Sequence, residues 1–209
     1  ILVFIATIVC SSQLAAQNVM SLSSAEGVPQ DVVEIELSIT NADSFVAFQT
    51  EIPLGDNLYY VENAAVLYRN VDHQLVASVV DGTLKLYSFS LSGKTFNDND
   101  GVVVTFQLRL GNEPGNFPLN HTKAKIVSGT GNAFQLTTQN SSVTVVAPKL
   151  EISTPQLNYG HIPIRSSYNK TLTVINSGNT SLMINGLQFS DESLSCPSFV
   201  EKTVAAGSS

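Results

Sequence analysis

The sequence of 209 residues lacks tryptophan, has only two cysteines and is poor in charge, and each shortage narrows the function. Lys and Arg number 10 against 17 Asp and Glu, a net charge of −7, so the positive footprint of a nucleic-acid-binding protein is absent. Without tryptophan, the widest ring for stacking a sugar is missing. Charged residues make up only 13% of the chain, so we expect broad faces that are polar but uncharged.

An apolar run at the start predicts a secretory signal peptide. Residues 1–9 read ILVFIATIV, and small residues follow. The run is too short to span a membrane. We therefore expect residues 1–17 to be an N-terminally truncated signal peptide and the mature chain to be secreted or on the cell surface, without membrane insertion. The alternative is a lipoprotein signal with lipidation at Cys10. After cleavage only Cys196 remains, so no internal disulfide is expected.

Residues 33–52 carry the pattern on which the predicted fold depends. Apolar and polar residues alternate strictly over 33–39, which is typical of a strand with one buried face. Asn41, Ala42, Asp43 and Ser44 then suit a turn, because Asn and Asp side chains cap their own backbone. A second strand with aromatic residues follows at 45–52.

Similar segments continue to residue 146, and no amphipathic helix of ten residues is evident. The predicted strands are residues 19–23, 58–61, 64–68, 74–80, 83–91, 102–110, 123–127, 134–138 and 142–146, with turns at 26–30 and 81–82 and a loop at 111–118. Many short strands at this spacing predict an all-β sandwich or jelly roll.

A second, smaller set of strands follows a linker around Pro148. It is predicted at residues 150–153, 157–159, 170–176 and 182–187, with a core of Leu172, Val174, Leu182 and Ile184. Gly178 is expected to supply a positive φ in the turn at 176–179. The pattern stops before another strand. We therefore expect two domains, residues 18–147 and a C-terminally truncated one at 148–209.

The first domain resembles a bacterial cohesin domain, a jelly roll of the kind that carbohydrate-binding modules also adopt. The matching segments are residues 33–39, the corner 41–44, the aromatic strand 45–49, the segment 53–58, the Gly-led strand 100–106 and the closing strand 142–145. The resemblance implies a nine-stranded jelly-roll β-sandwich that binds a dockerin module through a flat sheet face. The sequence departs from the family at Glu51, Ile52 and Pro53, where Tyr-Asp-Pro is usual.

The second domain resembles the immunoglobulin-like repeats of the ASPM–SPD-2–Hydin type. The matching residues are 157–164 and 170–179, which contain the aromatic-Gly pair at Tyr159 and Gly160 and the Asn-Ser-Gly-Asn turn. The resemblance implies a smaller, incomplete immunoglobulin-like β-sandwich.

The sequence shows no constellation of catalytic residues, and we expect neither an enzyme nor a cofactor. Asp98 and Asp100, in the run Asn-Asp-Asn-Asp-Gly, are weak candidates for binding Ca²⁺ through carboxylate oxygens. The strand that follows leaves no place for the bidentate Glu of an EF-hand, so a solvated turn is preferred. His73, His121 and His161 lie in separate segments, and none stands at metal-ligand spacing from another His or Cys.

Four tyrosines are weak candidates for a partner-binding patch, because tyrosine is favoured at recognition surfaces. They are Tyr59, Tyr60, Tyr68 and Tyr87. Two hypotheses follow: a cell-surface module that binds a protein partner such as a dockerin, or a carbohydrate-binding module of a larger protein that binds polysaccharide. A flat, mixed polar sheet face favours the protein partner. A coplanar row of exposed aromatic rings in a groove favours the polysaccharide.

Overall fold

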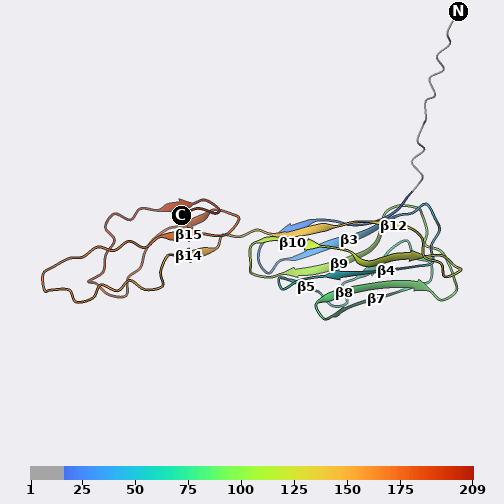
Figure 1. Cartoon of the computed structure of the whole chain (residues 1–209), viewed down its shortest axis with the longest axis horizontal. Coiled ribbons are helices and arrows are strands. Elements are labelled where there is room, and N and C mark those ends of the chain that lie inside the picture. Colours follow the sequence, from blue (N-terminus) through green and yellow to red (C-terminus); the bar gives the residue numbers. More distant parts are fainter. Residues whose placement is uncertain (1–16) are drawn as a thin grey trace, which may run out of the picture.

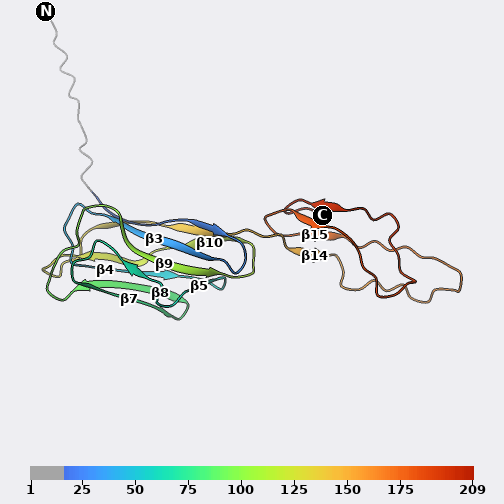
Figure 2. The same cartoon turned by 180° about the vertical axis from the view of Figure 1, so that it is seen from behind.

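The computed structural model describes residues 17–209. The predicted signal peptide up to residue 16, with the lipidation candidate Cys10, lies outside the described residues. Every regular element in residues 17–209 is a β-strand, so that part of the chain has no helix that could cross a membrane. Figure 1 shows a broad N-terminal sandwich, built from β1 to β13, and a thinner C-terminal block beyond one end of it. The view from behind shows the same arrangement (Figure 2).

Three sheets make up the N-terminal sandwich. Sheet A runs in the order β12 (Leu136–Gln139), β1 (Asn18–Leu22), β3 (Val32–Thr40), β9 (Val102–Leu110) and β5 (Leu58–Tyr60), and β6 (Val66–Leu67) also pairs with β9. Sheet B is β10 (Gly115–Leu119), β13 (Ser141–Val145) and β2 (Ala25–Gly27). Sheet C is β11 (Thr122–Val127), β4 (Ala47–Pro53), β8 (Thr83–Ser90) and β7 (His73–Val80).

Sheet B continues one edge of sheet A. The strand β1 pairs in parallel with β12, and β2, which follows β1, pairs in parallel with β13, which follows β12. The other pairings in the sandwich are antiparallel. The result is a two-layer jelly-roll sandwich, and the predicted all-β fold class is confirmed.

The core lies between the layers and follows the alternation of the sequence. Ile35, Leu37 and Ile39 of β3 are fully buried, whereas Glu34 and Glu36, which alternate with them, are exposed. The inward residues of β9 and of sheet C complete one continuous cluster. Its β9 and sheet C members include Val104, Phe106, Leu108, Leu110, Phe48, Ile52, Leu84, Leu86 and Ile126.

Two segments of the sandwich differ from the prediction. The predicted loop at 111–118 contains the strand β10, and the predicted turn at 26–30 contains β2. Both strands contain glycine, and β10 also contains Pro118, residues that normally indicate turns. They are tolerated because both strands lie at the edges of sheet B, where a proline removes no hydrogen bond needed by a neighbour.

The C-terminal block has less regular structure than predicted. β14 (Leu150–Ile152) pairs with β15 (Val174–Asn176), and β16 (Leu182–Ile184) pairs with β17 (Lys202–Val204). The predicted strand at 157–159 is absent, and β17 was not predicted. Of the predicted core, Leu172 is 43% exposed and the other three residues are only half-buried, while Val204 is buried. Pairings of three residues leave this block with little enclosed apolar surface.

The turn at residues 176–179 holds the linker to the C-terminal block. Asn179 donates through Nδ2 to the Val145 carbonyl at 2.7 Å and accepts the Ala147 N–H at its Oδ1, at 2.9 Å. The fully buried Asn176 accepts the Lys149 N–H at 3.1 Å and donates to the carbonyls of Thr180 and Val204. The linker is therefore hydrogen-bonded along its length rather than a free tether.

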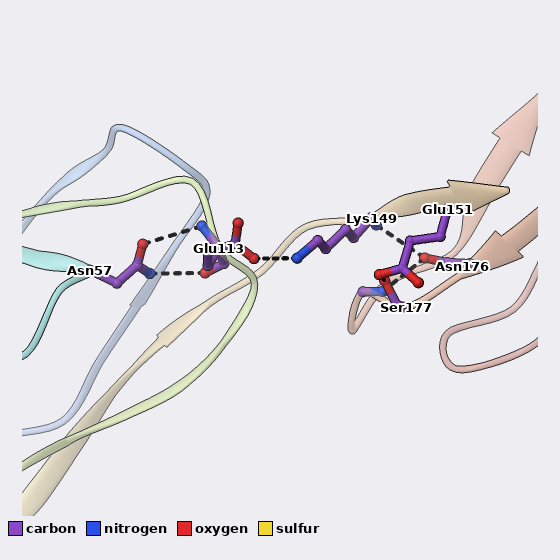
Figure 3. A network of polar contacts seen from close by, with 7 residues as sticks. Asn57, Glu113, Lys149, Glu151, Asn176 and Ser177 are labelled. Carbon is purple, nitrogen blue, oxygen red and sulfur yellow. Dashed lines mark hydrogen bonds and ion pairs between the residues drawn. The ribbon is translucent and has the colours of Figure 1, made fainter. Parts of the chain in front are cut away.

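An ion pair adds a link back to the sandwich. Lys149 Nζ lies 2.5 Å from Glu113 Oε2, and Asn57 holds the backbone of Glu113 with two hydrogen bonds (Figure 3). On the other side of Lys149, Ser177 donates to Glu151. These contacts run from one block to the other through Lys149.

Gly178 has a different role from the one predicted. It is not among the residues with positive φ. A Cβ at Gly178 would instead lie 2.4 Å from the carbonyl oxygen of Ala147 and 2.4 Å from the nitrogen of Lys149. Glycine is needed at this position because the linker backbone passes directly over it.

We predict that Gly178→Ala loosens this joint. The added methyl group forces the linker away, at a cost of roughly 1–3 kcal/mol in the free energy of unfolding of the C-terminal block. Thermal unfolding and limited proteolysis at residues 147–149 measure the effect. Gly186→Ala is the matched control, because nothing lies within 4 Å of a Cβ there. Equal stability and equal cleavage in the two variants would contradict the prediction.

Candidate functional site

The outer face of sheet C is an open surface of four strands. Phe48, Thr50 and Ile52 of β4 point into the core, so the residues between them point to solvent. The paired residues of neighbouring strands form straight rows across the sheet, such as Lys125, Gln49, Tyr87 and Val76. The face consists of Ala47, Gln49, Glu51, Pro53, Gln74, Val76, Ser78, Val80, Thr83, Lys85, Tyr87, Phe89, Lys123, Lys125 and Val127.

Glu51 is the polar centre of this face and is only 7% exposed. Its carboxylate lies 3.1 Å from Lys123 Nζ, accepts the hydroxyl of Tyr87 at 3.1 Å and lies 3.9 Å from Lys85 Nζ. The hydrogen bond from Lys123 is the main reason that the pKa of Glu51 is lowered, and Tyr87 adds to it. Burial, and then the neighbouring carboxylate, raises the pKa of Tyr87. The cluster therefore holds an ionised carboxylate and a neutral tyrosine in fixed positions.

The charge of the face is opposite to that of the chain. Lys85, Lys123 and Lys125 lie on it with Glu51 as the one carboxylate, whereas the chain carries a net charge of −7. One lysine charge is neutralised by Glu51. The face is therefore mixed, with two lysines on β11, Glu51 on β4, Lys85 and Tyr87 on β8, and Val76 and Val80 on β7.

The four tyrosine candidates do not form one patch. Tyr87 lies on sheet C, whereas Tyr59 and Tyr68, 46% and 44% exposed, belong to the β5 and β6 side of sheet A. Tyr59 stacks against the guanidinium of Arg109 at 5.4 Å and donates to the Asp56 carbonyl. Tyr60 turns inward and packs against the core, and burial raises its pKa.

Tyr59 and Tyr60 do share a cavity of about 470 Å³ at the end of the sandwich. Asp56 and Glu62 also line it, so aromatic and acidic groups lie together there. The C-terminal block has a separate, larger cavity of about 690 Å³, lined mainly by apolar residues such as Leu172, Val174 and Phe199.

The acidic run at residues 97–101 is organised around Arg69. The guanidinium donates to the carbonyl oxygens of Asn97, Asp98, Gly101 and Ile39 and to Oδ1 of Asn41, at 2.6–3.2 Å. Burial lowers the pKa of Arg69, while Asp98 and Asp100 act in the opposite direction. The guanidinium of Arg69 is thus hydrogen-bonded to the carbonyl oxygens of this loop. Ca²⁺ binding at the weak candidates Asp98 and Asp100 stays a hypothesis.

Two of the three histidines lie inside the sandwich. His73 packs against Phe96 with ring centroids 3.8 Å apart, and His121 shares a hydrogen bond of 2.8 Å with Thr50. Burial lowers the pKa of His121 to about 4 and also lowers that of His73. His161 is exposed on the C-terminal block. Within residues 17–209, no three His, Cys, Asp or Glu side chains lie together in a way that could hold a metal ion.

Sequence reasoning missed the lysines of sheet C and the role of Arg69. The alternation in β4 and β8 already places Glu51 and Lys85 on the solvent side, which is a usable signal. Lys123 reaches Glu51 only because β11 pairs with β4. No local pattern predicts that pairing.

We predict that Arg69→Met destabilises the sandwich by roughly 2–4 kcal/mol, because several carbonyl oxygens lose their donor. Chemical denaturation measures the loss, and Arg109→Met, which removes an exposed guanidinium, should cost less than about 1 kcal/mol.

Added Ca²⁺ should leave the melting temperature of the unmodified chain unchanged. A clear rise with Ca²⁺ would show that the acidic loop binds the ion despite Arg69.

We also predict that His121 makes the sandwich sensitive to acid. Its pKa in the folded chain, about 4, lies below the ordinary value of 6.5, so the unfolded chain takes up the proton first. The contribution of neutral His121 to the free energy of unfolding is therefore fully present above pH 6.5 and is lost as the pH falls toward 4. His121→Gln should reduce this fall by roughly 1–2 kcal/mol, a figure lowered for solvent screening of the half-buried ring. His161→Gln is the control, and identical pH profiles for both variants would refute the prediction.

Comparison with known proteins identifies the fold of the sandwich. No family model and no curated protein matches the sequence. Among solved structures, a non-cellulosomal cohesin from Archaeoglobus fulgidus is similar with a TM-score of 0.55 and 16% identity, over 63% of this chain and 93% of that one. The sixth cohesin of scaffoldin B from Acetivibrio cellulolyticus, solved with the Cel5 dockerin, gives 0.51 and 14%, over 62% and 99%. The cohesin CaCohA2 from Clostridium acetobutylicum gives 0.51 and 12%, over 62% and 90%. At these identities the likeness shows the fold alone: the N-terminal sandwich has the cohesin fold.

Proposed function

We propose that this chain is a non-catalytic, secreted or cell-surface module that binds a protein partner of the dockerin type through the outer face of sheet C. The observation that carries the proposal is the shape and chemistry of that face. It spans four paired strands, and its centre is a group of hydrogen-bonded polar side chains around Glu51. Apolar residues such as Val76, 46% exposed, lie beside that centre. Such a mixture of apolar and polar groups is typical of protein interfaces.

The fold supports the same proposal. The cohesin of scaffoldin B was solved in complex with a dockerin, and its structure is similar to the sandwich. At 14% identity the contact residues of that complex are not transferred to this chain. What favours sheet C here is its own geometry, because two of its three well-exposed valines and three lysines lie on one surface.

The C-terminal block fits the role of a spacer. We propose that the chain divides into domains at residues 147–148 and that the second domain is immunoglobulin-like. The hydrogen bonds of Asn176 and Asn179 to the linker support a fixed spacing between the two parts. Such a spacer would hold the binding face of sheet C away from whatever follows.

A carbohydrate-binding function is the second candidate, and one observation favours it. Tyr59 is 46% exposed at a cavity of about 470 Å³ that also contains Asp56 and Glu62. A ring beside carboxylates is a common arrangement for a sugar. This candidate is the weaker one because the cavity has one exposed aromatic ring and because Tyr59 and Tyr87 belong to different sheets.

The proposal predicts that a bulky side chain in the middle of sheet C blocks binding. We expect the full chain to bind at least one dockerin module from the same genome in a calorimetric titration. Gln49→Trp should weaken that binding by about tenfold or more, because the indole ring holds the two surfaces apart. Gln107→Trp makes the same change on the outer face of sheet A, since its neighbours Phe106 and Leu108 point inward, and should have little effect.

A glycan array separates the two candidates. Binding to a glycan that Tyr59→Ala abolishes, together with no binding to any dockerin, would replace the proposed function with the second one. Dockerin binding that both tryptophan variants retain would place the contact outside the face of sheet C.

A further inference from the structure

The strand β7 forms an open edge of sheet C. It contains eight residues, and β8 is its one neighbour in the sheet among the described residues. Its last five residues include three exposed valines, since Val76, Val79 and Val80 are 46%, 44% and 44% exposed. The edge presents a row of backbone N–H and C=O groups to another strand.

The other sheet edges of the sandwich carry features that discourage pairing. β11, at the opposite edge of sheet C, has an irregular register between Thr122 and Lys125, a positive φ at Lys123 and two lysines. The edge strand β10 contains Pro118. The remaining edge strands are short: four residues in β12, three in β5, three in β2 and two in β6. Shortness, charge, proline and bulges are the usual means of protecting an edge.

β7 has none of these features. Its sequence, HQLVASVV, contains no Lys, Arg, Asp, Glu, Pro or Gly. It pairs with β8 without a break over all eight residues, from His73 to Val80, so the strand is straight. A long, regular and uncharged edge of this kind is suited to the addition of another strand.

We propose that β7 is a dimerisation edge, at which two copies of this chain pair antiparallel through β7 to form one continuous sheet of eight strands. The best match for an uncharged, valine-rich edge is a second such edge. A two-fold axis at the middle of the strand lets each copy supply the same groups to the other. Leu75, Ala77 and Val79 then meet on the inner side, and Val76, Ser78 and Val80 on the outer side.

The features of the other edges limit the assembly to a dimer. Once β7 is paired, the edge left on sheet C is β11, which carries lysines and an irregular register.

The ends of β7 add a weak repulsion, because Asp72 precedes the strand and Asp81 follows it. In the antiparallel pair these two carboxylates of different copies approach one another, so the dimer should tighten as salt is added. The inference stands independently of the proposed function.

Sedimentation velocity of the full chain over about 5–300 µM tests the dimer. We expect the unmodified chain to dimerise within this range. Val76→Lys places a charge in the middle of the edge and should raise the dissociation constant by about tenfold or more. Val32→Lys is the matched control, because Val32 is 53% exposed on β3 within sheet A, and it should dimerise as the unmodified chain does. A monomer at every concentration, or a Val76→Lys variant that still dimerises, would overturn the proposal.

Two further measurements test the dimer even if the Val76→Lys variant folds poorly. Amide hydrogen exchange in β7 of the unmodified chain should slow as the concentration rises, while exchange in β11 should not change. Asp81→Asn keeps the two-residue turn formed by residues 81 and 82, since Asn-Gly suits the positive φ of both, and should tighten the dimer at low salt. Exchange in β7 that is independent of concentration would rule out pairing at this edge.

Discussion

The pairing of β3 with β9 is the constraint on which the rest of the sandwich depends. These are the two longest strands, nine residues each, and they lie side by side in the middle of sheet A. Their inward residues are fully buried. β1 pairs on the free side of β3, and β5 and β6 pair on the free side of β9 (Figure 1). Because β3 and β9 are far apart in sequence, the chain must close a long loop before this core forms.

That loop contains three of the four strands of sheet C, and β11 joins the sheet only after β9. The strands β4, β7 and β8 all lie between β3 and β9 in the sequence, so the pairing brings sheet C over the core. Arg69 then fixes one end, because its guanidinium joins the end of β3, through Ile39 and Asn41, to the loop that precedes β9. The burial of one side of sheet C against the core determines which of its residues point inward. The positions of Gln49, Lys85 and Tyr87 on the outer face follow from the period of two.

Local pattern accounts for what could be predicted from the sequence. The alternation of β3 and β9 and the Asp81-Gly82 turn are determined by neighbouring residues, and the structure contains all three. β2 and β10 could not be predicted, because glycine and Pro118 obscure strands that exist through pairing with β13. Gly178 was identified as important for the wrong reason, since the close approach of Ala147 comes from another segment. The distribution of the four tyrosines over two sheets could not be predicted for the same reason: alternation gives the side of a strand, but not which sheet the strand joins.

Sheet C differs from sheet A because its long strand β7 lies at an edge and has one neighbour among the described residues. Sheet A has β1, β5, β6 and β12 beside its two long strands, and sheet B continues its edge. The linker leaves from β13 of sheet B, and the C-terminal block extends beyond the end of the sandwich, away from β7 (Figures 1 and 2). Neither the outer face of sheet C nor the β7 edge is covered by the described chain. If two copies pair at β7, the outer faces of their sheets C join into one surface. If that face binds a protein partner as proposed, each binding site then has an identical neighbour. Pairing would then raise the avidity for a partner that carries two docking modules, without any new contact to either one.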